Sequence, residues 1–204
     1  MHYKVSLLTR TLLLAVVFQV TTSQAQQKFS KRQIEKIKTE TLNQVQAQHK
    51  NTQVMIDKVF SFAELGFQEF ETSAYLTKIL EEAGFEVKTG LSGIPTSWMA
   101  TWSFGEGPVI ALGSDVDCIP KASQYPGVAY HKPMVEGAPG HGEGHNSGVP
   151  VIITAALTLQ EQMKKNKLGG TLVIWPGIAE EQLGSKAWYV RDGYFDKIDM
   201  CIFT

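Results

Sequence analysis

Residues 109–120 read VIALGSDVDCIP, an apolar run that ends in two acidic residues and a proline. Val109 to Gly113 are apolar without interruption, which is typical of a strand buried on both faces of a sheet. Asp115 and Asp117 follow at the carboxyl end of this strand, where open α/β sheets bind their ligands. The stretch therefore predicts a central strand with a polar site at its end.

Two further buried strands are predicted after this stretch, at residues 171–175 (TLVIW) and 200–203 (MCIF). A helical pattern at residues 149–163 (VPVIITAALTLQEQM) separates the first two strands, and a short helix is expected at about 185–191. Strands that alternate with helices predict an α/β fold, with a largely parallel or mixed sheet covered by helices.

Three helices and two strands are predicted ahead of the central strand. The helices carry thin apolar stripes, and the second strand alternates apolar and polar side chains. We expect Gly66 to end the second helix, and Thr72 with Ser73 to cap the third. The predicted helices span about 30–50, 51–65 and 72–83, and the strands begin at about 85 and 98.

The first 25 residues resemble a signal peptide. Lys4 and Arg10 precede a short apolar run at residues 11–20, and Ser23 to Ala25 form a small-x-small cleavage site. An uncleaved membrane anchor is the alternative, but a bilayer span takes about 20 apolar residues. We expect cleavage after Ala25, a periplasmic or secreted protein and no membrane contact afterwards.

Charge and cysteine content narrow the functional classes. The formal net charge is −1, and no basic stripe with interleaved aromatic residues occurs, so nucleic acid is not an expected partner. Cys118 and Cys201 lie in apolar, strand-like surroundings. We expect two buried free thiols and no disulfide framework.

Residues 139–148 read PGHGEGHNSG and place His141, Glu143 and His145 at alternate positions. Alternate side chains of an extended segment share a face, so these three groups are expected to point the same way. Imidazole and carboxylate are Zn²⁺ ligands. A polar surface loop with solvated histidines is the alternative for this stretch alone.

Glu180 and Glu181 form a third acidic segment, after the predicted strand at 171–175. Two divalent ions about 3.5–4 Å apart can share ligands from several segments. One glutamate of such a pair can bind metal while the other remains free as a general base. Each segment alone has a simpler explanation, such as a turn or a helix start, but the three together predict a metal site.

Several motifs in the same order resemble the zinc aminoacylase/carboxypeptidase family of metallo-exopeptidases, in particular its p-aminobenzoyl-glutamate hydrolase B-subunit group. The resemblance covers about residues 53–204. The motifs are FAELGFQEFETS (62–73), GIPT (93–96), DCIP (117–120), GHGEGHN (140–146), EE (180–181) and VRDGYFD (190–196).

The resemblance implies a role for each matching residue. Glu143, His145 and Glu181 would bind metal, Glu180 would be the general base, and Asp117 would support the metal cluster. The implied cofactor is two divalent ions, Zn²⁺ with Mn²⁺ as the alternative. The implied reaction is hydrolysis of an acyl- or aroyl-amino-acid amide, or a dipeptide-like molecule, such as p-aminobenzoyl-glutamate.

Two positions depart from the family pattern. Glu143 stands where members of the group usually have cysteine, and a harder ligand could change the preferred metal. Asp115 stands where the wider family has histidine, so Asp115, like His141, is expected at most to support the metal site.

The resemblance also implies a longer protein with a further ligand histidine, a lid or dimerisation domain and a homo-oligomeric form. Residues 26–204 would then be the N-terminal part of the catalytic domain, and we expect the 204-residue chain alone to be poorly active. The alternatives are a non-catalytic periplasmic binding protein on the same fold and a two-metal phosphoesterase. Glu180 argues against the first, and the ordered motifs argue against the second.

Overall fold

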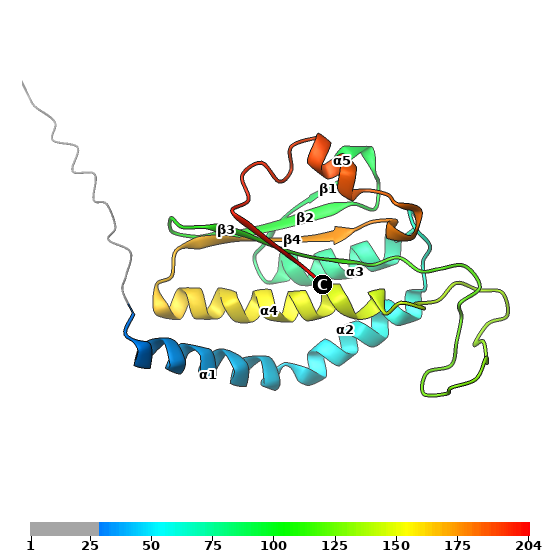
Figure 1. The fold of residues 1–204 in the computed structure, drawn as a ribbon, viewed down its shortest axis with the longest axis horizontal. Coiled ribbons are helices and arrows are strands. Elements are labelled where there is room, and N and C mark those ends of the chain that lie inside the picture. The colour runs from blue at the N-terminus through cyan, green and yellow to red at the C-terminus, as the bar shows by residue number, and fades with distance from the viewer. Residues whose placement is uncertain (1–28) are drawn as a thin grey trace, which may run out of the picture.

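The computed structural model describes residues 29–204, and the predicted signal peptide lies outside them. A five-stranded mixed sheet forms the centre of the fold, with helices on both of its faces (Figure 1), which confirms the predicted α/β class. The strands are β1 (Glu86–Thr89), β2 (Trp98–Phe104), β3 (Val109–Asp115), β4 (Gly170–Gly177) and β5 (Met200–Phe203).

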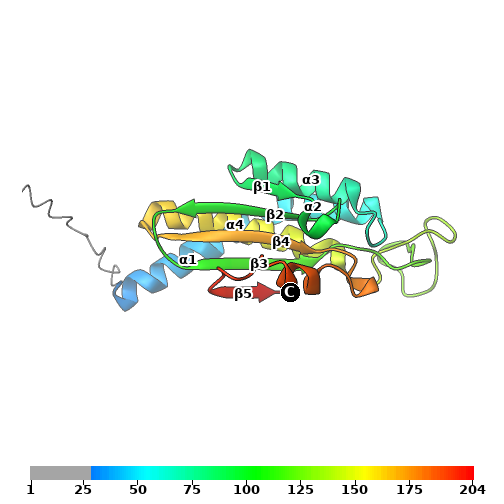
Figure 2. The ribbon, with the colours of Figure 1, turned by 90° about the horizontal axis from the view of Figure 1, so that it is seen from above.

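The strand order is β1-β2-β4-β3-β5, as seen from above in Figure 2. β3 pairs in parallel with β4 and β5, whereas β2 is antiparallel to β1 and β4. Asp115 at the end of β3 lies opposite Gly177 at the end of β4. The segments that follow these two strands therefore start side by side, at the carboxyl end of the parallel strands.

The helices form two layers on one face of the sheet. α3 and α4 lie against the strands, and α1 and α2 lie on the far side of α4, while α5 is on the opposite face (Figure 1). The helices are α1 (Lys31–Ala47), α2 (His49–Phe62), α3 (Phe70–Glu82), α4 (His145–Asn166) and α5 (Lys186–Arg191), and short 3₁₀ turns occur at η1 (Leu91–Gly93) and η2 (Glu180–Gln182).

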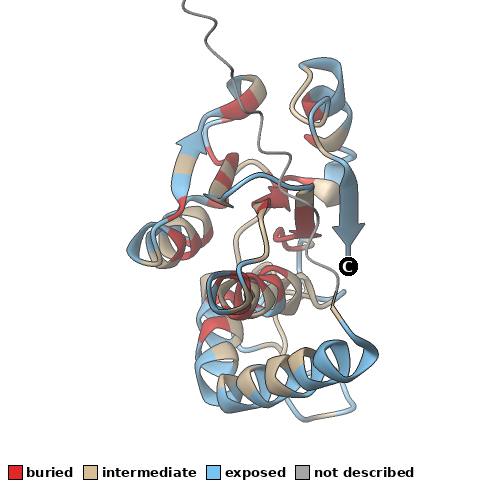
Figure 3. Ribbon diagram, turned by 90° about the vertical axis from the view of Figure 1, so that its left-hand side faces the viewer, coloured by how far each residue is buried: buried red, intermediate tan, exposed pale blue. Residues whose placement is uncertain are grey.

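The hydrophobic core lies between α4, α3 and the central strands (Figure 3). Ile153 of α4, Leu76 of α3 and Ile174 of β4 are fully or almost fully buried. Burial of each such side chain contributes about 1.5–3 kcal/mol. α1 has no buried residue and lies on the outside. Within residues 29–204, none of the helices is long and apolar enough to cross a membrane.

β5 differs from the prediction of a third buried strand, because all four of its residues are exposed. It is the edge strand of the sheet in the part of the chain that the structure describes, and it pairs only with β3. Cys201 on β5 is consequently exposed, so the expectation of two buried thiols is wrong for Cys201 and confirmed for Cys118. Both cysteines are free.

The predicted caps of α2 and α3 are also wrong. α2 ends at Phe62, and its C-cap is Ala63, whose backbone is left-handed (φ 50°), three residues before Gly66. α3 starts at Phe70, before the expected Thr72, and its first amides are satisfied from a distance. The Glu64 carboxylate accepts hydrogen bonds from the backbone N–H groups of Glu71 at 2.9 Å and Thr72 at 2.8 Å.

Candidate metal centre

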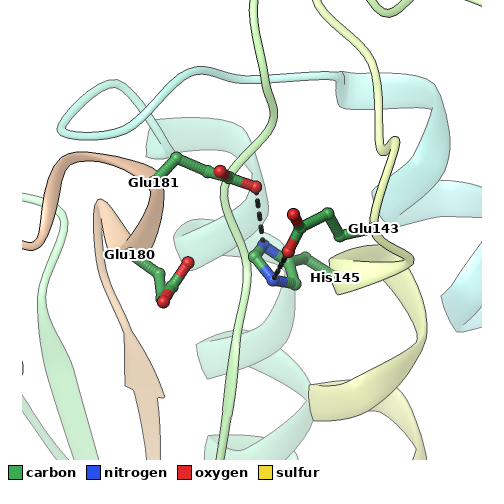
Figure 4. Close-up of side chains that lie close together, drawn as sticks. All are labelled: Glu143, His145, Glu180 and Glu181. Atoms are coloured by element: carbon green, nitrogen blue, oxygen red, sulfur yellow. Dashed lines mark ion pairs between the residues drawn. The ribbon is translucent and has the colours of Figure 1, made fainter.

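Four candidate ligands meet at the carboxyl ends of β3 and β4 (Figure 4). Glu143 lies in the loop before α4 and His145 is the first residue of α4, while Glu180 and Glu181 begin η2 just after β4. One ligand atom from each side chain lies within 4.8 Å of the others. The parallel pairing of β3 with β4, and the helix that connects them, bring these segments together.

His145 lies at the centre of this cluster. Its Nδ1 atom is 3.1 Å from the backbone oxygen of Asp117 and 3.9 Å from Glu181 Oε1, and its Nε2 atom is 3.7 Å from Glu143 Oε2 (Figure 4). The Asp117 carboxylate, and to a smaller extent its backbone oxygen, raises the pKa of His145 to about 9, against the opposing effect of burial. The metal-free imidazole is therefore protonated at neutral pH, and a metal ion must displace that proton.

Asp117 connects the end of β3 to both other segments of the site. It is 1% exposed, and its Oδ2 atom accepts a hydrogen bond from the backbone N–H of Glu181 at 3.1 Å. Its Oδ1 atom is 3.5 Å from His145 Nδ1 and is buried without a hydrogen-bond partner. In the metal-free protein the protonated imidazole supplies positive charge beside this oxygen, and a bound metal ion would supply it once the proton is displaced.

The acidic groups of the cluster also favour a cation. Burial raises the pKa of Glu181, and the neighbouring Glu143 carboxylate raises it further. Carboxylate and imidazole atoms at these separations are the donors that divalent Zn²⁺ and Mn²⁺ accept. The residues present therefore fit a divalent metal centre.

Asp115 lies outside the ligand cluster. Its carboxylate is 2.9 Å from the ammonium group of Lys186 at the start of α5. Burial raises the pKa of Asp115, and Lys186 opposes that shift. Lys186 Nζ also lies 4.0 Å from Glu180 Oε1. Asp115 is thus the partner of a lysine that is close to the glutamate pair.

His141 also lies apart from Glu143 and His145. Gly144 turns the chain with φ 91° and α4 starts at His145, so the segment is not extended and the expected shared face is absent. The Nε2 atom of His141 is 3.3 Å from the backbone oxygen of Val59. Burial lowers the pKa of His141 to about 4. This histidine therefore packs under the loop as a neutral side chain.

The sequence patterns did not identify two residues that lie close to the site. Lys186 belongs to no motif that the sequence singled out. Glu69 lies within residues 62–73, but nothing in the pattern indicated that its carboxylate is fully buried and bonded to Ala179, next to the glutamate pair. Both contacts join residues far apart in the chain, and spacing along the sequence carries no signal for them.

No family model matches the chain. Among curated proteins, the chain is 34% identical over 147 residues to the B-subunit of p-aminobenzoyl-glutamate hydrolase from Escherichia coli. This alignment covers 72% of this chain and 30% of that protein. It is 31% identical over 144 residues to N-acetyl-L-cysteine deacetylase of Bacillus subtilis, over 69% of this chain and 32% of that protein. The chain spans about a third of the length of these relatives.

The fold is similar to that of solved structures. The YXEP protein of Bacillus subtilis, described as a dinuclear metal-binding peptidase from the M20 family, superposes with a TM-score of 0.64 at 23% identity. The superposition covers 78% of this chain and 43% of that protein. At this identity the likeness establishes the shared fold.

Proposed function

The chain belongs to the aminoacylase/carboxypeptidase family of metallopeptidases, in the p-aminobenzoyl-glutamate hydrolase B-subunit group, and on that premise we propose that its protein hydrolyses the amide bond of a small acyl- or aroyl-amino acid. The observation that carries the proposal is the cluster of Glu143, His145, Glu180 and Glu181, with the buried Asp117 beside it. These residues come from three separate segments and converge only in the folded chain.

Each residue of the cluster has a role in the proposed reaction. Glu143, His145 and Glu181 would hold two divalent ions, Zn²⁺ or Mn²⁺, and Asp117 would orient His145. The bound metal supplies polarisation of the amide carbonyl and a lowered pKa of water. Glu180 takes the proton from the attacking water and passes it to the leaving amine. The short distances among Glu143, His145, Glu180 and Glu181 support a shared site, and the division of roles among them comes from the family resemblance.

Glu143 distinguishes this site from a thiolate-containing one. A carboxylate is a harder ligand than cysteine and favours harder ions, so Mn²⁺ is a stronger candidate here than at a cysteine site. The exposed position of Glu143 leaves its carboxylate free to move toward an ion.

The substrate and the cellular setting are further parts of the proposal. The name of the Escherichia coli relative supports p-aminobenzoyl-glutamate as the first substrate to try, and dipeptide-like amides as the next. The pattern of residues 1–25 supports export to the periplasm or the medium. A homo-oligomer and weak activity of the 204-residue chain by itself stay predictions from the family resemblance.

The test is metal content together with turnover of p-aminobenzoyl-glutamate, measured on the 204-residue chain and on any longer product of the same gene. We expect about two ions per protein and release of glutamate. Bound metal without amide hydrolysis in a longer product would favour the non-catalytic binding protein, whereas weak turnover by the 204-residue chain alone is expected. Hydrolysis of phosphate esters in preference to amides would favour the phosphoesterase.

A further inference from the structure

Glu69 is a fully buried carboxylate that the proposed reaction does not use. It precedes α3, is 0% exposed and forms no ion pair with any cation among residues 29–204. Burial raises its pKa. Because a buried carboxylate without a cationic partner is unfavourable, Glu69 depends on hydrogen bonds to its two oxygens.

Both oxygens of Glu69 accept hydrogen bonds from distant segments. Oε1 accepts the backbone N–H of Ala179 at 2.9 Å, and Oε2 accepts the hydroxyl of Thr96 at 2.8 Å. Ala179 immediately precedes Glu180 and Glu181. The carboxylate therefore connects the start of α3 to the first peptide of the segment that carries the glutamate pair.

The segment that Glu69 holds has an unfavourable backbone. Three of its residues adopt positive φ, a backbone conformation that residues other than glycine rarely adopt: Ala179 (φ 53°), Leu183 (φ 57°) and Ser185 (φ 54°). Such residues persist only where the surrounding structure fixes them. The hydrogen bond from Ala179 to Glu69 is one such constraint, placed at the first of the three positions.

Gly66 provides a second constraint on the same segment. A Cβ atom at Gly66 would lie 2.9 Å from Ala179 Cα, so only glycine allows this approach of the two backbones. The side-chain amide of Gln182 also donates to the Gly66 backbone oxygen at 3.3 Å. Residues 66–69 thus form a support against which η2 is packed.

We propose that Glu69 is a positioning residue, which fixes the Ala179 peptide and thereby the direction in which Glu180 and Glu181 leave the end of β4. The inference rests on the proposed function for its effect on catalysis and metal binding. The role requires an acceptor at the correct distance from Ala179 and does not require a negative charge. Glutamine at position 69 should therefore preserve the hydrogen bond to Ala179, whereas aspartate, which is shorter by one methylene, should lose it.

The first experiment needs no metal. Hydrogen exchange is measured for amides 179–182 in the metal-free protein, for the variants E69Q, E69D and E64D. E69D should exchange about fivefold faster or more, because the Ala179 hydrogen bond is lost, and E69Q should exchange like the wild type. E64D shortens the carboxylate that binds the amides of Glu71 and Thr72 by the same amount, and should leave amides 179–182 unchanged.

The second experiment measures Zn²⁺ affinity by competition with a chromophoric chelator. E69D should weaken binding about tenfold or more, as loss of a supporting contact to a metal site does, while E69Q and E64D stay close to the wild type. Wild-type exchange in E69D, or equally fast exchange in E69Q and E69D, overturns the positioning role. If the wild-type protein binds neither Zn²⁺ nor Mn²⁺, the proposed function fails, and the exchange comparison still decides the role of Glu69.

Discussion

His145 connects most of the proposed site, since it contacts Asp117, Glu143 and Glu181 within 4 Å. The same residue carries a proton in the metal-free protein, because Asp117 raises its pKa to about 9. Metal affinity and proton release are therefore coupled through a single imidazole.

We predict that Zn²⁺ binding at pH 7.5 releases close to one proton per protein from His145, and that affinity rises with pH until about 9. Calorimetry in buffers of different ionisation enthalpy measures this number. In D117N, the pKa of His145 should fall toward its ordinary value, so fewer protons should be released. Equal proton release in D117N and the wild type would show that another group supplies the proton.

Glu180 and Glu181 are adjacent but have different proposed roles, which substitution can separate. E180Q should lower kcat by about 10²- to 10⁴-fold, the contribution of a general base, without changing metal content. E181Q should lower both kcat and metal content. Metal content is measured by elemental analysis beside the kinetics. Loss of bound metal in E180Q would instead make Glu180 a ligand.

His141 should contribute to acid sensitivity of the fold. Its pKa is about 4 in the folded chain against an ordinary value of 6.5, so the unfolded chain binds a proton that the folded chain does not. Stability should therefore fall between pH 6.5 and 4, by at most about 3 kcal/mol. Urea unfolding across this range should show a smaller fall in H141Q, whose amide can still donate to Val59. H131Q, at an exposed position, should behave like the wild type.

At the scale of the elements, the unit β3–α4–β4 was predictable because burial leaves a pattern in the sequence. Continuous apolar runs mark its two strands, and the helical pattern at 149–163 marks α4, although the helix begins earlier, at His145. The caps at Gly66 and Thr72 were not predictable. Distant contacts, such as the Glu64 carboxylate on the first amides of α3, replace the local capping that the sequence suggested.

The pair of Asp115 on β3 and Lys186 on α5 should stabilise the contact between these two elements. K186M leaves the Asp115 carboxylate buried without its cation, and should reduce the free energy of unfolding by about 1–3 kcal/mol. The double variant D115N/K186M should recover part of that loss, because it removes the unpaired charge. Urea denaturation measures both.

An exposed pair offers a control for this comparison. Lys78 and Glu82 lie 3.9 Å apart on the surface of α3, and both side chains are more than 60% exposed. K78M should change stability by less than about 0.5 kcal/mol. A K186M variant as stable as K78M would show that the Asp115 pair contributes no more than a surface pair.

At the scale of the whole molecule, the fold class followed from the alternation of apolar runs, and the four residues of the candidate metal cluster lie in two of the short motifs. The separation of His141 from the site, the exposure of β5 and the burial of Glu69 did not follow. Each depends on what packs against the residue in three dimensions, and an apolar run such as MCIF has the same pattern whether or not another element covers it.

Metal should stabilise the whole molecule, because the ligands come from segments that only the folded chain brings together. With Zn²⁺ at about 100 times its dissociation constant, the gain is about 2.7 kcal/mol, which corresponds to a rise in Tm of several degrees. Melting curves with added Zn²⁺ and with EDTA measure it. H145A should lose most of the shift, and an equal shift in H145A would place the ion elsewhere.

The parallel pairing of β3 with β4 has a consequence for the order of events during synthesis. Parallel strands cannot be joined by a tight turn, so the crossover through α4 must be complete before Asp117 and Glu181 can meet. Non-local contacts of this kind cost loop-closure entropy before they form, and they slow folding. A nascent chain on the ribosome would therefore not bring Asp117 and Glu181 together until residue 181 had left the exit tunnel, so the candidate cluster cannot assemble before the whole crossover has been synthesised.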